Sequence, residues 1–135
     1  MTGVQTCALP ISAVSAGTYH TVAIRSGGTL FTWGYNGQGQ LGDGTIVHKS
    51  SPVQIGSSSW TAVSAGTDFS AAIRSGGTLF TWGLGTSGQL GDGTTASKSS
   101  PVQIGSSSWT AVSAGSLHTA AIRSDSLLFT WGQNL

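Results

Sequence analysis

The sequence predicts an all-β fold, a β-propeller fragment of about two and a half four-stranded blades, and three observations support this prediction. First, Phe31–Thr45 returns almost unchanged as Phe80–Thr94 and begins again at Phe129, a fixed interval of 49 residues. Second, each interval contains four short runs of β-forming residues separated by glycine. Third, large aromatic rings recur at the same interval, at Trp33, Trp82 and Trp131. A period of this length built from short strands is typical of propellers and solenoids.

The first strand of each repeat is short and ends at a glycine. Ala13–Gly17 is its N-terminal copy, and its full form is seen in Trp60–Gly66 and Trp109–Gly115. Residues that alternate along it are small or apolar on both faces. This pattern favours a sheet that packs on two sides, as a blade packs between its neighbours.

The next two runs predict a hairpin. His20–Ile24 and Leu30–Trp33 are joined by Arg25–Thr29, whose centre is Gly-Gly, and glycine accepts the positive φ that tight turns require. The glycine-rich segment Gly34–Thr45 is then expected to be a long structured loop. It leads to Ser51–Ile55, where Pro52 lacks a backbone donor and so favours an outer edge strand.

The first eleven residues, 1–11, fit no repeat. Back-translated, they resemble a short-read sequencing adapter, and we expect a non-native leader that is set aside in reasoning about the fold. Cys7, the only cysteine, lies in this leader and therefore says nothing about the redox compartment. The remaining chain, 12–135, divides into repeat 1 (12–61), repeat 2 (62–110) and a partial repeat 3 (111–135).

Composition excludes several classes of protein. Charged residues make up 7% of the chain and the net charge is +1, so the basic stripe of a nucleic-acid binder is missing. Hydrophobic residues make up 38% and fall in regular short runs, which argues against a disordered linker. No run reaches the roughly 18 apolar residues of a membrane-spanning helix, so we expect no membrane insertion.

The repeat also carries a family resemblance. The pattern Ala-Gly-x-x-His, followed by Gly-x-Leu-Phe-Thr-Trp-Gly-x-Asn-x-x-Gly-Gln-Leu-Gly-Asp-Gly-Thr, is similar to the regulator of chromosome condensation repeat. The resemblance covers Ser12 to Leu135 and implies a seven-bladed β-propeller. Seven blades of this period would need roughly 350 residues, so we expect an internal fragment whose natural neighbours include the missing blades of the same propeller.

The chain departs from this pattern in three places. Phe69 stands where the other copies have His20 and His118, Gly85 stands where they have asparagine, and Asp125-Ser126 replaces the Gly-Gly turn. A histidine that one blade exchanges for phenylalanine is not expected to be a catalytic base or a metal ligand. We interpret it as a buried imidazole bonded to backbone between blades, which the resemblance also implies.

The search for reactive groups is negative, and we expect no catalytic residue, no metal site and no cofactor. The common nucleophile, zinc and phosphate-loop motifs do not occur. Asp43 and Asp92 are repeat equivalents in Asp-Gly turns, where an aspartate usually bonds the local backbone. A calcium site is the alternative, but calcium needs several converging carboxylates and each turn supplies one.

The differences between repeats point towards function. Between Ala13–Thr61 and Ala62–Thr110, 38 of 49 positions are identical and the eleven differences form three clusters. A scaffold that presents a composite binding surface would show this pattern, because loops carry recognition and strands carry packing. Recent duplication with tolerant loops is the alternative interpretation. The predicted partner-contacting residues are Tyr19, His20, Tyr35, Asn36, Ile46, Val47, His48, Asp68, Phe69, Leu84, Thr95 and Leu117.

The sequence thus predicts a non-enzymatic protein-interaction scaffold that presents variable loops to an unknown protein partner. Its sparse charge and Ser/Thr/Gly-rich surface favour a bacterial or viral protein at an extracellular or cell-surface location. The family resemblance implies an alternative, a guanine-nucleotide exchange factor or regulator of a Ran-like GTPase. That activity depends on a protruding wedge, for which the uniform 49-residue spacing leaves no room in these blades. A second alternative is an inhibitor of an extracellular enzyme such as a β-lactamase.

Overall fold

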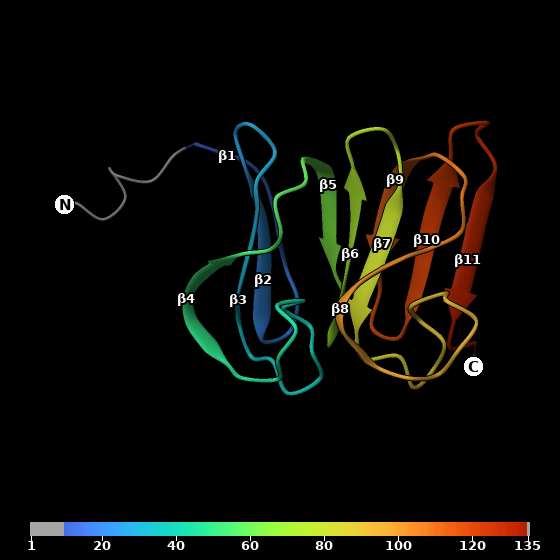
Figure 1. Cartoon of the computed structure of the whole chain (residues 1–135). Helices are drawn as coiled ribbons and strands as arrows, with labels where there is room; N and C mark the ends of the chain where they lie inside the picture. The colour runs from blue at the N-terminus through green and yellow to red at the C-terminus, as the bar shows by residue number, and fades with distance from the viewer. Residues whose placement is uncertain (1–9, 135) are drawn as a thin grey trace.

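The protein is a row of β-sheets that stand side by side, as the computed structural model of residues 10–134 shows (Figure 1). Each sheet is antiparallel and follows chain order, and the described residues contain no helix. Accordingly, these residues include no helix of the length and apolarity needed to cross a membrane. The predicted all-β fold built from propeller blades is confirmed.

Each sheet is one blade, and its strands run from the inner to the outer edge of the propeller. Blade 1 contains β1 (Ile11–Ala16), β2 (His20–Arg25), β3 (Leu30–Gly34) and β4 (Lys49–Gln54). Blade 2 contains β5 (Trp60–Ala65), β6 (Phe69–Arg74), β7 (Leu79–Gly83) and β8 (Lys98–Gln103). Blade 3 contains β9 (Trp109–Ala114), β10 (His118–Arg123) and β11 (Leu128–Gly132).

Residues 1–9 of the predicted leader lie outside the described residues, but its last residue belongs to the first blade. Ile11 pairs with Arg25 across β1 and β2. In the next blade Trp60 pairs with Arg74 in the same way. Ile11 therefore occupies the position at which the later repeats have tryptophan, and blade 1 begins one residue before the predicted boundary.

The hairpin turns show why the repeat needs glycine at their centre. Gly27 and Gly28 have φ values of 101° and 97°, in the left-handed region that side chains disfavour. Blade 3 turns at the same place without glycine, and only the second central residue, Ser126, has a positive φ, of 71°. There the Asp125 carboxylate pairs with Arg123 and accepts the backbone N–H of Leu127, which holds the strained residue in place.

The core lies between blades rather than within them. Ile24, Leu30 and Ile55 of blade 1 pack against Trp60, Ala72 and Trp82 of blade 2. The equivalent residues of blades 2 and 3 form a second cluster, which contains Ile73, Leu79, Ile104, Trp109 and Ala121. In both clusters two indole rings meet edge to face, with centroids 6.2 Å and 6.1 Å apart. The recurring tryptophans therefore fill the space between blades, where a buried aromatic ring contributes about 2–3 kcal/mol.

Candidate functional site

Residues that vary between the repeats gather at one end of the sheets. In blade 1 they come from the β1–β2 connection and from the long β3–β4 loop, which the backbone bond from Tyr35 N to Tyr19 O joins at 2.8 Å. The Tyr19 and Tyr35 rings lie edge to face at 6.3 Å, and His48 stacks on Tyr35 at 4.6 Å. We call Tyr19, Tyr35 and His48 the aromatic cluster. It unites the three stretches of sequence in which the repeats differ.

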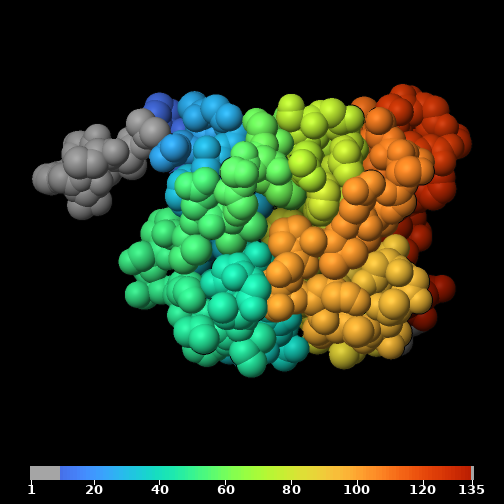
Figure 2. All heavy atoms as spheres, in the orientation of Figure 1, coloured from blue at the N-terminus to red at the C-terminus, as the bar shows by residue number. Residues whose placement is uncertain are grey.

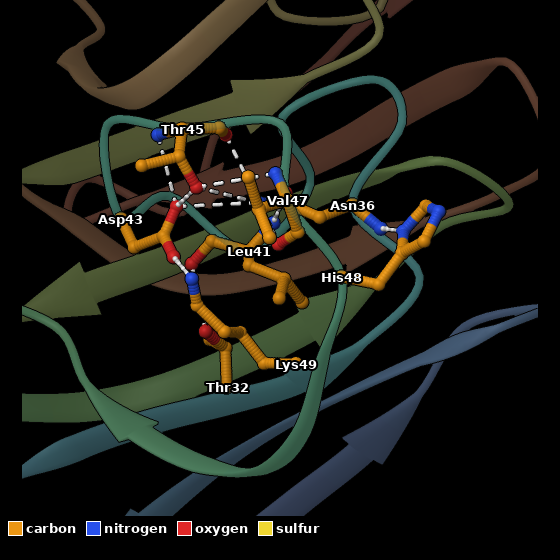
Figure 3. A network of polar contacts seen from close by, with 8 residues as sticks. All are labelled: Thr32, Asn36, Leu41, Asp43, Thr45, Val47, His48 and Lys49. Atoms are coloured by element: carbon orange, nitrogen blue, oxygen red, sulfur yellow. Dashed lines mark hydrogen bonds and ion pairs between the residues drawn. The ribbon is translucent and has the colours of Figure 1, made fainter.

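The β3–β4 loop of blade 1 is built around one buried amide (Figure 3). The Asn36 side chain is fully buried, and its Nδ2 donates to the carbonyl oxygens of Thr45 at 2.9 Å and Val47 at 3.0 Å. Its Oδ1 accepts the backbone N–H of Leu41 at 3.0 Å. The backbone N–H of Asn36 donates to Nδ1 of His48 at 2.9 Å. One residue thus fixes the path of the whole loop and orients the His48 ring.

An aspartate turn closes the same loop. Asp43 Oδ1 accepts the backbone N–H and the hydroxyl of Thr45 at 3.0 Å and 2.8 Å, and Oδ2 lies 3.2 Å from Lys49 Nζ. Burial disfavours the charged carboxyl, but these hydrogen bonds outweigh it and lower the pKa of Asp43. Asp92 has the same partners in blade 2. Both aspartates bond local backbone as predicted, and within residues 10–134 no group of three or more metal-ligating side chains is gathered.

The equivalent loop of blade 2 reaches a similar shape without the amide. A Cβ built on Gly85 would lie only 2.3 Å from the carbonyl oxygen of Ala96, so the loop backbone occupies the space that a side chain would need. The backbone N–H of Gly85 donates to Ser97 Oγ at 3.2 Å, as that of Asn36 donates to His48. Figure 2 shows these two loops, teal and yellow-orange, lying next to each other on the surface.

His20 is buried between blades 1 and 2. Its Nε2 lies 2.9 Å from Ser70 Oγ, and this hydroxyl donates to the carbonyl oxygen of Gln40 at 2.8 Å. Burial lowers the pKa of His20 to about 4, and a backbone contact with Phe69 opposes only part of that shift. The ring is therefore neutral at physiological pH. It is buried between blades as the sequence predicts, but its hydrogen-bond partner is the Ser70 hydroxyl rather than the backbone.

The predicted contact residues divide into three groups by exposure. Exposed residues are Tyr19, Tyr35, Ile46, Val47, His48 and Thr95. Half-buried residues are Asp68, Leu84 and Leu117, and buried residues are His20, Asn36 and Phe69. The buried group cannot touch a partner in this structure, so its members support the loops from within. Only the first two groups can form a contact surface.

Comparison of the repeats missed Gln40 because both repeats carry it, as Gln40 and Gln89. Gln40 is fully buried; its Oε1 accepts the backbone N–H of Gln38 at 2.8 Å and its Nε2 donates to Asp68 at 3.2 Å. Its carbonyl oxygen accepts the indole N–H of Trp82 at 2.9 Å. The loop of blade 1 is thereby fixed to the face of blade 2. The sequence did contain a signal for this role, because Gln40 and Gln89 are uncharged polar residues retained in both copies of an otherwise apolar and glycine-rich motif.

Comparison with known families and proteins agrees with this architecture. The family described as the regulator of chromosome condensation (RCC1) repeat matches residues 27–73 and 76–122, and a second description of the same repeat matches residues 11–40 and 60–89. The ultraviolet-B receptor UVR8 of Arabidopsis thaliana is 47% identical over 45 residues, which is 33% of this chain and 10% of that protein. The E3 ubiquitin-protein ligase highwire of Drosophila melanogaster is 38% identical over 50 residues, which is 37% of this chain and 1% of that protein.

Solved structures show the same fold at low sequence identity. Human WBSCR16 superposes with a TM-score of 0.83 at 23% identity, covering 90% of this chain and 33% of that one. Yeast RCC1 (Prp20), in its complex with Kap60, superposes with a TM-score of 0.77 at 22% identity, covering 90% and 32%. The chain thus spans about a third of these propellers and about a tenth or less of the curated relatives above. Its repeats, its blades and its inter-blade core place this chain in the regulator of chromosome condensation (RCC1) repeat family.

Proposed function

We propose that the chain is a protein-interaction scaffold and that the loops of blade 1 make the principal contacts with the partner. One observation carries this proposal: the aromatic cluster lies exposed beside two further exposed apolar side chains, Ile46 and Val47. At the equivalent positions blade 2 has no aromatic ring: it has the half-buried Leu84 in place of Tyr35, and the small or polar residues Asp68, Thr95, Ala96 and Ser97 at the other four.

Exposed tyrosines suit this role because they bury large areas while losing few rotamers on binding. Tyrosine is enriched among the interface residues that contribute most binding energy. Tyr19 is 71% exposed and is available to a partner without rearrangement. Tyr35 is already held by its stack on His48, and the loop beneath it is fixed by Asn36. A loop ordered before binding loses less entropy when the complex forms.

A carboxylate borders this surface. Asp68 occupies in blade 2 the position of Tyr19 in blade 1, and Gln40 connects it to the blade 1 loop. Within residues 10–134 it forms no ion pair, whereas Asp43, Asp92 and Asp125 each have one. A partner that brings a lysine or arginine to this point would gain a charge-assisted hydrogen bond and contact with the tyrosine rings.

Affinity capture with a matched pair of variants tests the proposal. The double variant Tyr19→Asp/Tyr35→Leu places the blade 2 residues on the blade 1 loops. The control, Ser26→Asp/Ser75→Leu, makes changes of the same kind at exposed positions of the hairpin turns, at the other end of the sheets. We expect proteins that bind both wild type and control to be depleted about tenfold or more by the double variant. Equal capture by all three chains would contradict the proposal.

A second candidate, regulation of a small GTPase, is favoured by the superposition on yeast Prp20. Another crystal structure of Prp20p from Saccharomyces cerevisiae, described together with the binding properties of Prp20p to Gsp1p and histones, also superposes with a TM-score of 0.77. Release of a fluorescent GDP analogue from purified Gsp1p, measured with and without this chain, tests the candidate directly. Acceleration that depends on chain concentration would favour exchange activity, and an unchanged rate would leave the scaffold as the better account.

A further inference from the structure

Asn36 is followed directly by Gly37, and this pair occurs once in the sequence. Asparagine is a thermolabile residue. Its amide is lost most readily before glycine, because glycine has no Cβ to shield the backbone nitrogen that attacks the amide. The other asparagine, Asn134, precedes leucine, and blade 2 has Gly85 in place of asparagine. The reactive pair therefore lies only in the loop that supports the aromatic cluster.

The fold buries this amide and fixes it at both ends (Figure 3). Asn36 is 0% exposed. Its Nδ2 donates to the carbonyl oxygens of Thr45 and Val47 at 2.9 Å and 3.0 Å, and to Asp43 Oδ1 at 3.2 Å. Its Oδ1 accepts the backbone N–H of Leu41 at 3.0 Å. Loss of the amide nitrogen would break every bond that Nδ2 makes, so the folded loop opposes the reaction.

The loop is also fastened to blade 2. The backbone N–H of Gly44 donates to the Ser99 carbonyl oxygen at 2.8 Å, and the Trp82 indole donates to the Gln40 carbonyl oxygen at 2.9 Å. Asn36 can reach solvent only when these contacts and those inside the loop open together. Such local opening takes less free energy than unfolding of the whole chain, so it occurs more often.

We propose that Asn36 is a fold-protected deamidation site, and that its reaction inactivates the recognition surface of blade 1. In the opened loop the Gly37 nitrogen gives its proton to water and bonds to Cγ of Asn36, while Nδ2 takes up a proton and leaves as ammonia. Water then opens the cyclic imide. Cleavage at the side-chain carbonyl gives aspartate, and cleavage at the main-chain carbonyl gives isoaspartate. The inactivation rests on the proposed function, whereas the reaction does not.

Neither product can rebuild the loop. An aspartate at this position would turn an acceptor oxygen towards the carbonyls of Thr45 and Val47 and the carboxylate of Asp43, to which the amide had donated. Buried acceptors would then lack donors, and two close carboxylates repel each other. Isoaspartate lengthens the backbone and displaces the N–H that bonds His48. The aromatic cluster loses its support in either case.

Peptide mapping by mass spectrometry, during incubation at mildly alkaline pH, tests the reaction. Position 36 should change from amide to acid at least about tenfold faster in urea than in the folded chain, because only the opened loop reacts. Gly37→Ala places a methyl group beside the attacking nitrogen and should slow the reaction in urea at least about tenfold.

Two variants test the protection in the folded chain. His48→Ala removes the acceptor of the Asn36 N–H and should speed deamidation about fivefold, because the loop opens more often. His48→Ser supplies a hydroxyl acceptor and should return the rate towards that of wild type. An unmodified position 36 in urea, or equal rates in urea and in the folded chain, would overturn the inference.

The consequence is tested with Asn36→Asp, which carries one of the two products. This chain should unfold at a lower urea concentration than wild type and should capture at least about tenfold less of the proteins that wild type binds. Asn134→Asp adds the same charge at an exposed position and is the matched control. Equal urea midpoints for the two variants would overturn the inference. A lowered midpoint with unchanged capture would overturn the inactivation and the proposed function, and would leave the deamidation site standing.

Discussion

Blades 1 and 2 share their strands and differ in what fills the centre of the β3–β4 loop. In blade 1 the Asn36 amide enters the loop and bonds the backbone of three residues on its far side. In blade 2 Gly85 admits the Ala96 carbonyl into the same space. A buried amide in blade 1 and a close backbone approach in blade 2 are therefore alternative ways to hold one loop shape. Only in blade 1 can a single substitution, at Asn36, remove the hydrogen bonds that hold the loop.

The comparison also explains how the outer surface can change. His48 in blade 1 and Ser97 in blade 2 each accept the backbone N–H at the start of their loop. The acceptor is retained while the rest of the side chain differs. The imidazole in blade 1 supports Tyr35 by stacking, and the serine in blade 2 has no ring with which to support Leu84. Shared loop anchoring with variable outward groups is the physical basis of the proposed recognition surface.

The largest expected effect comes from removing the amide. Asn36→Ala leaves the N–H of Leu41 and the carbonyls of Thr45 and Val47 without their buried partner, which should lower the free energy of unfolding by about 3 kcal/mol. Urea unfolding measures the change. Asn134→Ala is the matched control, since Asn134 is the exposed equivalent in blade 3 and its loss should cost little. Equal effects of the two substitutions would show that the amide does not hold the loop.

Acid should weaken the first inter-blade contact more than the second. The folded pKa of His20 is about 4, below the 6.5 of an unperturbed histidine, so its contribution to stability is full above pH 6.5 and is lost as pH falls towards 4. The expected loss is about 2 kcal/mol at pH 5 relative to pH 8. Thermal unfolding across this range should show it.

His20→Phe introduces the residue that blade 2 already has and should flatten the pH profile between 6.5 and 4. The parallel variant His118→Phe changes an exposed histidine and should leave the profile as in wild type. A wild-type profile that is flat over this range would mean that His20 is not buried as described.

A smaller difference is expected at the loop acceptor. His48→Ala removes the partner of the Asn36 N–H and should cost about 1 kcal/mol. His48→Ser restores an acceptor of the kind found in blade 2 and should recover most of that loss. Unfolding midpoints of the two variants measure the difference. If serine were no better than alanine, the two blades would not share this anchoring bond.

The smallest effects should be the same in both blades. Lys49→Ala and Lys98→Ala each remove a partly exposed ion pair of 3.2 Å, and each should cost about 0.5 kcal/mol. High salt should reduce both losses, because it screens exposed charges. Losses that differ clearly between the two variants would show that the aspartate turns are not equivalent.

Features of the fold that repeat along the chain could be predicted from the sequence, because a residue that recurs in every repeat indicates a backbone conformation or a packing volume that every blade needs. The Gly27-Gly28 turn, the packing tryptophans and the presence of an outer strand around Pro52 follow from backbone conformation and ring volume alone. The bounds of that strand do not, since β4 begins at Lys49 and contains Pro52 rather than starting there. Features that depend on distant groups could not. Burial of Asn36 depends on Thr45 and Val47 folding over it, and the stack of Tyr35 on His48 joins residues from the two ends of a long loop.

Two further features needed the assembled blades. Gln40 does not vary between repeats, so comparing them could not reveal that it ties one blade to the next. Ile11 lies in the predicted leader because residues 1–11 fit no repeat and resemble a translated adapter, yet its backbone pairs with that of Arg25 in β2. In both cases tertiary contacts rather than residue type decide the role.

Crosslinking at equivalent positions of the two blades tests the central claim most directly. A photoreactive phenylalanine analogue placed at position 35 or at position 84 samples the same point of the same loop shape, once in blade 1 and once in blade 2. After capture and illumination, the account predicts a covalent adduct with the partner from position 35 and little or none from position 84. Equal adducts from both positions, or an adduct from position 84 alone, would contradict the claim that the blade 1 loops carry recognition.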